Sequence, residues 1–238
     1  METIFARHAN VALSFGGGRD SLACLHLLRR WWDRLTVYWL NPGNPFPETV
    51  AMMEDIRRMV PRFKEIPGRQ PEIIALDGWP SDVVPQRYTS DGNTIFGPTP
   101  FKVQTRLQCC IRALMLPGYN AMVRDGVTCC IRGKRSEEAD KTGIESGYVS
   151  EHGMELQFPI YDWTTADVVA YLQAQGVAEP ASYRYAKHSL DCMDCTAYWG
   201  DGLPQYLHAQ HPAAFTEYVR RIGLIKRAVA ESLSECEV

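Results

Sequence analysis

Apolar and polar positions alternate along the chain in blocks that predict strands and helices in turn. Val11–Phe15 is a short apolar run that ends in glycines, which is typical of a buried strand. Leu22, Leu25 and Leu28 then recur near helical spacing. We expect strands over residues 11–15, 35–40, 73–76 and 127–132, and helices over 21–32, 47–60, 102–116 and 164–175. This order predicts an α/β fold with a doubly wound, mostly parallel sheet.

The remaining segments are expected to be irregular or to lie outside the sheet. Residues 78–100, 133–153 and 178–202 are rich in turn-forming or polar residues and predict loops. Residues 205–234 predict a helical segment that is interrupted near His211-Pro212. We therefore expect one α/β domain over 1–203, followed by a helical tail over 204–238.

Composition and charge narrow the class of protein. The chain has 238 residues, of which 45% are hydrophobic, and a net charge of −3. A nucleic-acid partner is possible but is not indicated by this charge. We find no apolar leader and no apolar run long enough to span a membrane, so we expect a soluble, cytoplasmic protein. In a reducing compartment, the eight cysteines favour metal, cluster, redox or buried roles over a disulfide framework.

The turn after the first predicted strand is the main candidate for a phosphate site. A strand that leads through glycines into a helix directs several backbone N–H groups and the helix dipole to one point. The alternative is a plain tight turn, and the sequence is neither a Walker A loop nor a dinucleotide fingerprint. The candidate phosphate-binding residues are Ser14, Gly16, Gly17, Gly18, Arg19, Asp20 and Ser21.

Five segments in register resemble the motifs of one known family. The glycine turn resembles the SGGxDS loop of PP-loop ATP pyrophosphatases, with Gly16 in place of its serine and Ser14 nearby. The other four segments look like DTGxxFPET, GxRxxE, NPLxDW and xxGCxxC, and they are residues 41–49, 133–138, 158–163 and 189–195. Over roughly residues 10–200 the chain thus resembles the phosphoadenylyl-sulfate (PAPS) reductase-like family of the adenine nucleotide alpha-hydrolase-like superfamily.

The resemblance implies roles for further residues. Asn41, Gly43, Gly133, Lys134 and Glu138 would contact the nucleotide or its phosphates. The resemblance makes Arg135 a catalytic residue that holds the sulfate or phosphates, because guanidinium offers a fork of donors to such anions. Taken alone, it could equally be a solvated surface charge.

The cysteine pattern resembles that of adenylyl-sulfate reductases. Cys109-Cys110 and Cys192-x-x-Cys195 match their CC…CxxC, which implies a [4Fe–4S] cluster held by four thiolates. Zinc is the alternative metal, although adjacent cysteines are unusual around zinc. Cys109 and Cys110 could instead be small buried residues. For Cys129-Cys130, on a predicted strand, burial is the preferred interpretation.

Cys236 near the C-terminus is the candidate catalytic nucleophile. Sulfonucleotide reductases end in a Glu-Cys-Gly-Leu-His tail, of which only Glu235-Cys236 is present. The flanking Glu235 and Glu237 would raise the pKa of the thiol, although the nucleophile must be a thiolate. The alternative is a cysteine in a frayed tail.

Three functions remain open from the sequence. The first is reduction of adenylyl sulfate or phosphoadenylyl sulfate to sulfite, with a thioredoxin-like reductant as partner. The second is ATP-dependent activation of a nucleic acid or small molecule for sulfur insertion from a sulfur donor, for which Asp20, Ser21 and Glu138 could help to place Mg²⁺. The third is a nucleotide-binding module without activity. The CC…CxxC pattern favours the first, and we also expect a homo-oligomer.

Overall fold

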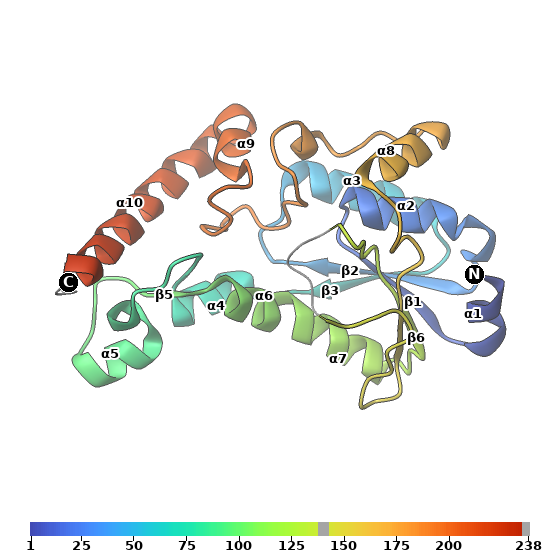
Figure 1. Cartoon of the computed structure of the whole chain (residues 1–238), viewed down its shortest axis with the longest axis horizontal. Coiled ribbons are helices and arrows are strands. Elements are labelled where there is room, and N and C mark those ends of the chain that lie inside the picture. Colours follow the sequence, from blue (N-terminus) through green and yellow to red (C-terminus); the bar gives the residue numbers. More distant parts are fainter. Residues whose placement is uncertain (138–142, 235–238) are drawn as a thin grey trace.

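The fold is built on a central parallel sheet. The computed structural model describes residues 1–137 and 143–234. Five strands lie in the order β3-β2-β1-β6-β7, and every neighbouring pair is parallel. Their bounds are β1 Val11–Phe15, β2 Leu35–Asn41, β3 Phe63–Pro67, β6 Cys129–Ile131 and β7 Glu155–Gln157. The prediction of a doubly wound α/β fold is confirmed (Figure 1).

Helices cover both faces of this sheet. One face packs against α2 (Arg19–Leu27), α3 (Pro47–Met59) and α8 (Thr165–Ala174) in the largest hydrophobic cluster. The other face packs against α7 (Leu116–Arg124), through Ala121 and Met122. A short helix, α1 (Glu2–Arg7), precedes β1. The strand order reverses at β1, which has β2 on one side and β6 on the other, so the turn that leaves β1 lies at the switch point where such sheets commonly bind ligands.

The prediction of a third strand over residues 73–76 is wrong. These residues lie in helix α4 (Gln70–Asp77), which has a proline in its first turn and Gly78 after its last. The third strand is β3, whose side chains are mostly half-buried or exposed and include Lys64 and Glu65. Both β3 and β7 are edge strands, and β7 was also missed. An edge strand can be polar, so an apolar run does not mark it.

The segment predicted as a long loop over 78–100 forms a small subdomain. It contains β4 (Trp79–Ser81), a 3₁₀ turn and α5 (Ser90–Phe96). β4 pairs in parallel with β5 (Val103–Thr105), so the helix predicted over 102–116 begins as a strand. After β5 the chain continues through α6 (Arg106–Cys110) and the π-helix Ile111–Met115 into α7.

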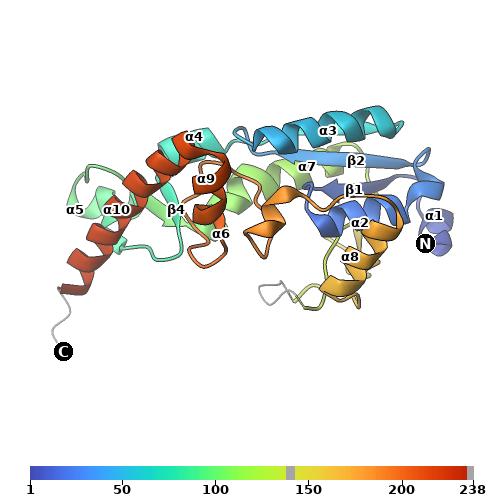
Figure 2. The same cartoon turned by 90° about the horizontal axis from the view of Figure 1, so that it is seen from above.

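The C-terminal helices follow the predicted pattern. α9 (Leu203–Gln210) and α10 (Pro212–Ser234) are separated at His211, as expected from the proline. Figures 1 and 2 show α10 running away from the sheet towards α5, where Tyr88 donates a hydrogen bond of 2.6 Å to Glu231. α9 and the first turns of α10 pack on Phe46, in the turn between β2 and α3. Among the described residues, no helix is long and apolar enough to cross a bilayer.

Candidate functional site

The glycine turn between β1 and α2 forms a close-packed loop. Gly17 has a φ of +83°, which favours glycine. A side-chain carbon at Gly18 would lie 3.0 Å from both Tyr183 and Ser189. Ser21 Oγ donates a hydrogen bond of 2.8 Å to the Gly18 carbonyl, which stabilises the start of α2. The turn is therefore close-packed against Tyr183 and Ser189, and its role as a phosphate site stays a prediction.

The loop after β6 packs directly against this turn. A side-chain carbon at Gly133 would lie 2.7 Å from the Asp20 carbonyl carbon, so only glycine allows this approach. Arg135 is 4% exposed, and its Nε donates a hydrogen bond of 2.8 Å to Asp20 Oδ1. Its Nη1 donates to Glu137 Oε2 at 2.9 Å, and the same carboxylate oxygen accepts from the Thr165 amide at 2.9 Å. Arg135 thus links the start of α2 to the start of α8.

A cavity of about 250 Å³ opens at the glycine turn. Its walls come from the turn, the start of α3, the segment before the cysteine motif, and α9. The lining residues are Gly16, Gly17, Gly18, Phe46, Glu48, Thr49, Met52, Ala178, Pro180, Ala181, Ser182, Tyr183, Ser189, Leu190 and Tyr206. We call this cavity the nucleotide pocket, because it contains the predicted phosphate loop.

Some predicted nucleotide residues shape the surroundings of this pocket. Arg19 stacks on Tyr183 at 4.3 Å and forms an ion pair of 2.8 Å with Glu179. Lys134 donates a hydrogen bond of 2.6 Å to the Ile144 carbonyl. Ser14 lies within β1, paired in register with Tyr38. The assignment of these residues to phosphate contacts stays a prediction.

Asn41 and Gly43 form the turn that leaves β2. Asn41 Oδ1 accepts a hydrogen bond of 2.9 Å from the Gly43 amide, while its Nδ2 donates to Glu65 at 2.7 Å. Gly43 has a φ of +99°, and a side chain there would meet Pro71 at 2.9 Å. This turn delivers Phe46 and Glu48 to the nucleotide pocket.

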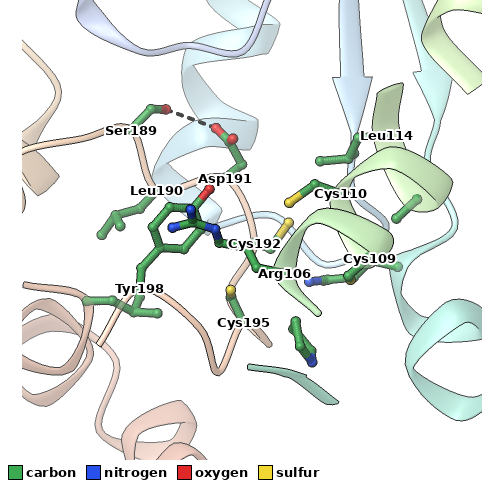
Figure 3. Close-up of a pocket in the computed structure, with 14 residues that line it drawn as sticks. Arg106, Cys109, Cys110, Leu114, Ser189, Leu190, Asp191, Cys192, Cys195 and Tyr198 are labelled. Carbon is green, nitrogen blue, oxygen red and sulfur yellow. Dashed lines mark hydrogen bonds between the residues drawn. The ribbon is translucent and has the colours of Figure 1, made fainter. Parts of the chain in front are cut away.

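The four cysteines of the CC…CxxC pattern line one cavity of about 50 Å³. Cys109 and Cys110 end α6, and Cys192 and Cys195 come from the irregular segment before α9. Figure 3 shows these two segments facing each other, with Arg106 and Tyr198 beside the cysteines. Arg106 stacks over the Tyr198 ring at 4.4 Å. We call this cavity the cysteine pocket.

Burial governs the ionisation of these thiols. It raises the pKa of Cys109 and of Cys195 to about 12, and the pKa of Cys192 well above its usual value. Burial also raises the pKa of Cys110, against the opposing effects of Arg106 and a hydrogen bond with Tyr198. The thiols are therefore protonated at neutral pH, and metal binding would have to release their protons.

The two cavities share a wall. Ser189 and Leu190 line both of them. Ser189 Oγ donates a hydrogen bond of 2.9 Å to Asp191 Oδ1, and that oxygen lies 3.7 Å from where a side-chain carbon of Gly16 would be. Burial raises the pKa of Asp191. Asp191 thus lies between the phosphate loop and Cys192.

Several of these residues lie in no sequence pattern that indicates a role. Asp191 could have been considered, because it precedes Cys192 directly. No spacing in the sequence indicated Tyr183, Arg106 or Tyr198, which reach the cavities from separate segments. Tyr198 has a φ of +61°, the only positive φ among the non-glycine residues of the described ranges.

Four other cysteines complete the chain. Cys129 and Cys130 lie buried in β6, which confirms the preferred interpretation of that pair. Cys24, which the sequence analysis did not consider, is buried in α2. The candidate nucleophile Cys236 lies outside the described residues, as does Glu138.

Comparisons with known proteins identify the family. The family model "Phosphoadenosine phosphosulfate reductase domain" matches residues 10–198. A phosphoadenosine 5′-phosphosulfate reductase of Gloeobacter violaceus is 26% identical over 197 residues, covering 81% of this chain and 74% of that protein. An adenosine 5′-phosphosulfate reductase of Neisseria meningitidis is 28% identical over 162 residues, covering 67% of this chain and 61% of that protein.

A solved structure supports the same conclusion at the level of the fold. The phosphate complex of a PAPS reductase from Candida auris matches with a TM-score of 0.54 at 13% identity, covering 79% of this chain and 84% of that chain. The family match and the two curated relatives support the prediction of an oxidoreductase enzyme. Because the family model matches residues 10–198, which are most of the chain, the protein belongs to the phosphoadenosine phosphosulfate reductase domain family.

Proposed function

We propose that this protein reduces adenylyl sulfate to sulfite and adenosine monophosphate. The observation that carries the proposal is the shared wall between the two cavities. A nucleotide whose phosphate lies at the glycine turn would direct its sulfate towards Ser189 and Asp191, beside the cysteine pocket. The names of the two curated relatives support the same chemistry.

The charge of the nucleotide pocket favours adenylyl sulfate over its 3′-phospho form. The described residues that line this pocket include no lysine or arginine. Glu48 contributes a carboxylate, which interacts with His211 Nε2 at 3.0 Å. An additional phosphate would bring two more negative charges into a pocket whose described lining carries a carboxylate and no lysine or arginine. We therefore expect a substrate with an unphosphorylated ribose.

The cysteine pocket offers the donor set of a [4Fe–4S] cluster. Four thiols line it, and four thiolates are the usual ligands of such a cluster. Within residues 1–137 and 143–234, no three His, Cys, Asp or Glu side chains are already grouped to hold a metal ion. This finding bears equally on zinc and on a cluster, so the preference for the cluster rests on the resemblance of the CC…CxxC pattern. Cys109, Cys110, Cys192 and Cys195 would hold the cluster, which would supply a redox-active group beside the substrate.

The reaction that we propose starts at Cys236. Its thiolate would bond to the sulfur of adenylyl sulfate, and the S–O bond to the phosphate would break, releasing adenosine monophosphate. One thiol of a thioredoxin-like partner would then attack the Cys236 sulfur and displace sulfite. The second thiol of the partner would free Cys236, so that the two partner thiols become one disulfide and supply the two electrons.

The proposal is tested by sulfite release. Anaerobic protein with adenylyl sulfate and a dithiol should release sulfite, and Cys236→Ser should reduce this to the rate without enzyme. Ser234→Ala, which removes a hydroxyl that bonds the Glu231 carbonyl, is the control and should keep the activity. Full activity in Cys236→Ser would exclude the proposed nucleophile. Acceptor-dependent pyrophosphate release from ATP, without sulfite formation, would favour the ATP-using alternative instead.

A further inference from the structure

Asp194, inside the CxxC motif, is held by the turn that leads into the nucleotide pocket. Asn44 Nδ2 donates a hydrogen bond of 2.5 Å to Asp194 Oδ2. The Asn44 carbonyl also accepts a hydrogen bond of 3.1 Å from the amide of Met193, the neighbouring residue of the motif. Two hydrogen bonds thus connect one residue of the β2–α3 turn to the two residues between Cys192 and Cys195.

The C-terminal helix α10 holds Asp194 from the other side. Arg221 Nη1 donates to the Asp194 carbonyl at 3.3 Å and to its Oδ1 at 3.4 Å. Arg221 is itself oriented by Glu217, one turn earlier on α10, through a hydrogen bond of 2.7 Å. The Arg221 side chain is 16% exposed, so solvent screens this contact less than it screens a surface pair.

The turn that carries Asn44 also forms a wall of the nucleotide pocket. The three residues that follow Asn44 closely in the sequence, Phe46, Glu48 and Thr49, all line that pocket. Phe46 is buried and packs against Tyr206 of α9, with ring centroids 5.3 Å apart. A ligand that orders this wall therefore acts on a segment that is bonded directly to the cysteine loop.

We propose that Asp194 is a positioning residue that couples nucleotide binding to closure of the cysteine loop. The inference rests on the proposed nucleotide site. When the pocket is filled, the ordered turn holds Met193 and Asp194 in place, and the loop carrying Cys192 and Cys195 opens less often. Local opening of this kind sets how fast a buried thiol reacts with a reagent in solution.

The test measures this opening by alkylation. The anaerobic full chain is treated with a chelator and iodoacetamide, with and without adenosine monophosphate, the part that the candidate substrates share. Mass spectrometry of the peptide containing Cys192 and Cys195 gives the alkylation rate. We expect saturating nucleotide to slow this rate at least about fivefold, which is the lower end of typical coupling between two sites.

Variants of Asn44 and of Arg221, which contact Asp194 from opposite sides, should change the alkylation rate in different ways. Asn44→Ala removes the side-chain bond from the turn, so we expect the nucleotide to protect the thiols less than about twofold. Arg221→Met removes the anchor on α10, so the unliganded rate should rise while the nucleotide still slows alkylation. Asp55→Asn, which neutralises an exposed carboxylate on α3, is the control and should match the parent chain.

Separate measurements distinguish the possible failures. Nucleotide affinity and thermal unfolding are measured for each variant, so that a folding defect is not mistaken for lost coupling. If adenosine monophosphate does not bind the parent chain, both the proposed function and this inference are wrong. If it binds without slowing alkylation, or if Asn44→Ala keeps the full protection, only the coupling through Asp194 is wrong.

Discussion

Single residues determine how closely the loop after β6 can approach the start of α2. Gly133 faces the backbone of Asp20 and Ser21, and backbone atoms cannot move aside as a flexible side chain can. The motif indicated a glycine and an arginine after the fourth predicted strand. It could not indicate that Arg135 would be buried against Asp20, because that contact joins residues far apart in the chain.

Replacing Gly133 should disrupt the phosphate loop. In Gly133→Ala the new methyl group would lie within 2.8 Å of three backbone atoms, which overpacks the contact at a cost of about 1–3 kcal/mol. We expect nucleotide affinity to fall at least about tenfold, measured by calorimetric titration with adenosine monophosphate. Gly143→Ala, where nothing described lies within 4 Å, should bind normally. Unchanged affinity in Gly133→Ala would show that this contact does not shape the loop.

Among the helices and strands, α6 carries the two cysteines, Cys109 and Cys110, that line the cysteine pocket. It is short, and it is stabilised at its start by a capping box in which Thr105 and Gln108 bond each other's backbone amides. The π-helix that follows shifts the helical register directly after Cys110, a feature that is frequent at functional sites. A helix was predicted here, but neither its strand-like beginning nor the π-helix has a simple sequence signal.

Loss of this cap should loosen the cysteine pocket. Thr105→Ala removes the side-chain acceptor for the Gln108 amide, at a cost of about 0.5–2 kcal/mol in the free energy of unfolding. Urea denaturation measures that cost, and if the cysteine pocket holds the proposed cluster, bound iron per chain should fall with it. Thr216→Ala on α10, which removes a hydroxyl that donates to the Pro212 carbonyl, should change neither. A stable Thr105→Ala variant with full metal content would contradict this expectation.

At the scale of the whole molecule, the C-terminal helices contact the sheet domain through the nucleotide pocket. The predicted division at residues 203 and 204 separates α9 and α10 from the rest. Leu207 and Tyr206 of α9 nevertheless pack in one cluster with Phe46, and Arg221 of α10 bonds Asp194. We therefore expect α9 to unfold together with the sheet domain, although the predicted boundary itself stays a prediction.

A buried residue of α9 can test this expectation. Leu207 is 0% exposed, and Leu207→Ala should lower the free energy of unfolding by about 2–5 kcal/mol. In calorimetry, a single transition should shift to lower temperature. Leu233→Ala on α10, which is 65% exposed, should stay within about 0.5 kcal/mol of the parent. Two transitions, of which only one moves, would instead indicate an independent helical tail.

The sequence by itself determined the features that depend on neighbouring residues. The apolar strand before the glycines, the helix over residues 164–175, and the break at Pro212 follow from local chemistry, and the structure contains all three. The edge strands β3 and β7 were not predicted from the sequence, because a strand at the edge of a sheet is less buried and needs no apolar run.

Only the tertiary structure decided how the two candidate cavities meet. Cys109 and Cys192 line one cavity, and Asn44, Asp194 and Arg221 form one cluster, although each set comes from distant parts of the chain. The free energy of such contacts depends on the packing of whole elements, which no local pattern contains. For that reason the sequence could indicate the cysteines and the phosphate loop. The wall that the two cavities share could be recognised only in the folded structure.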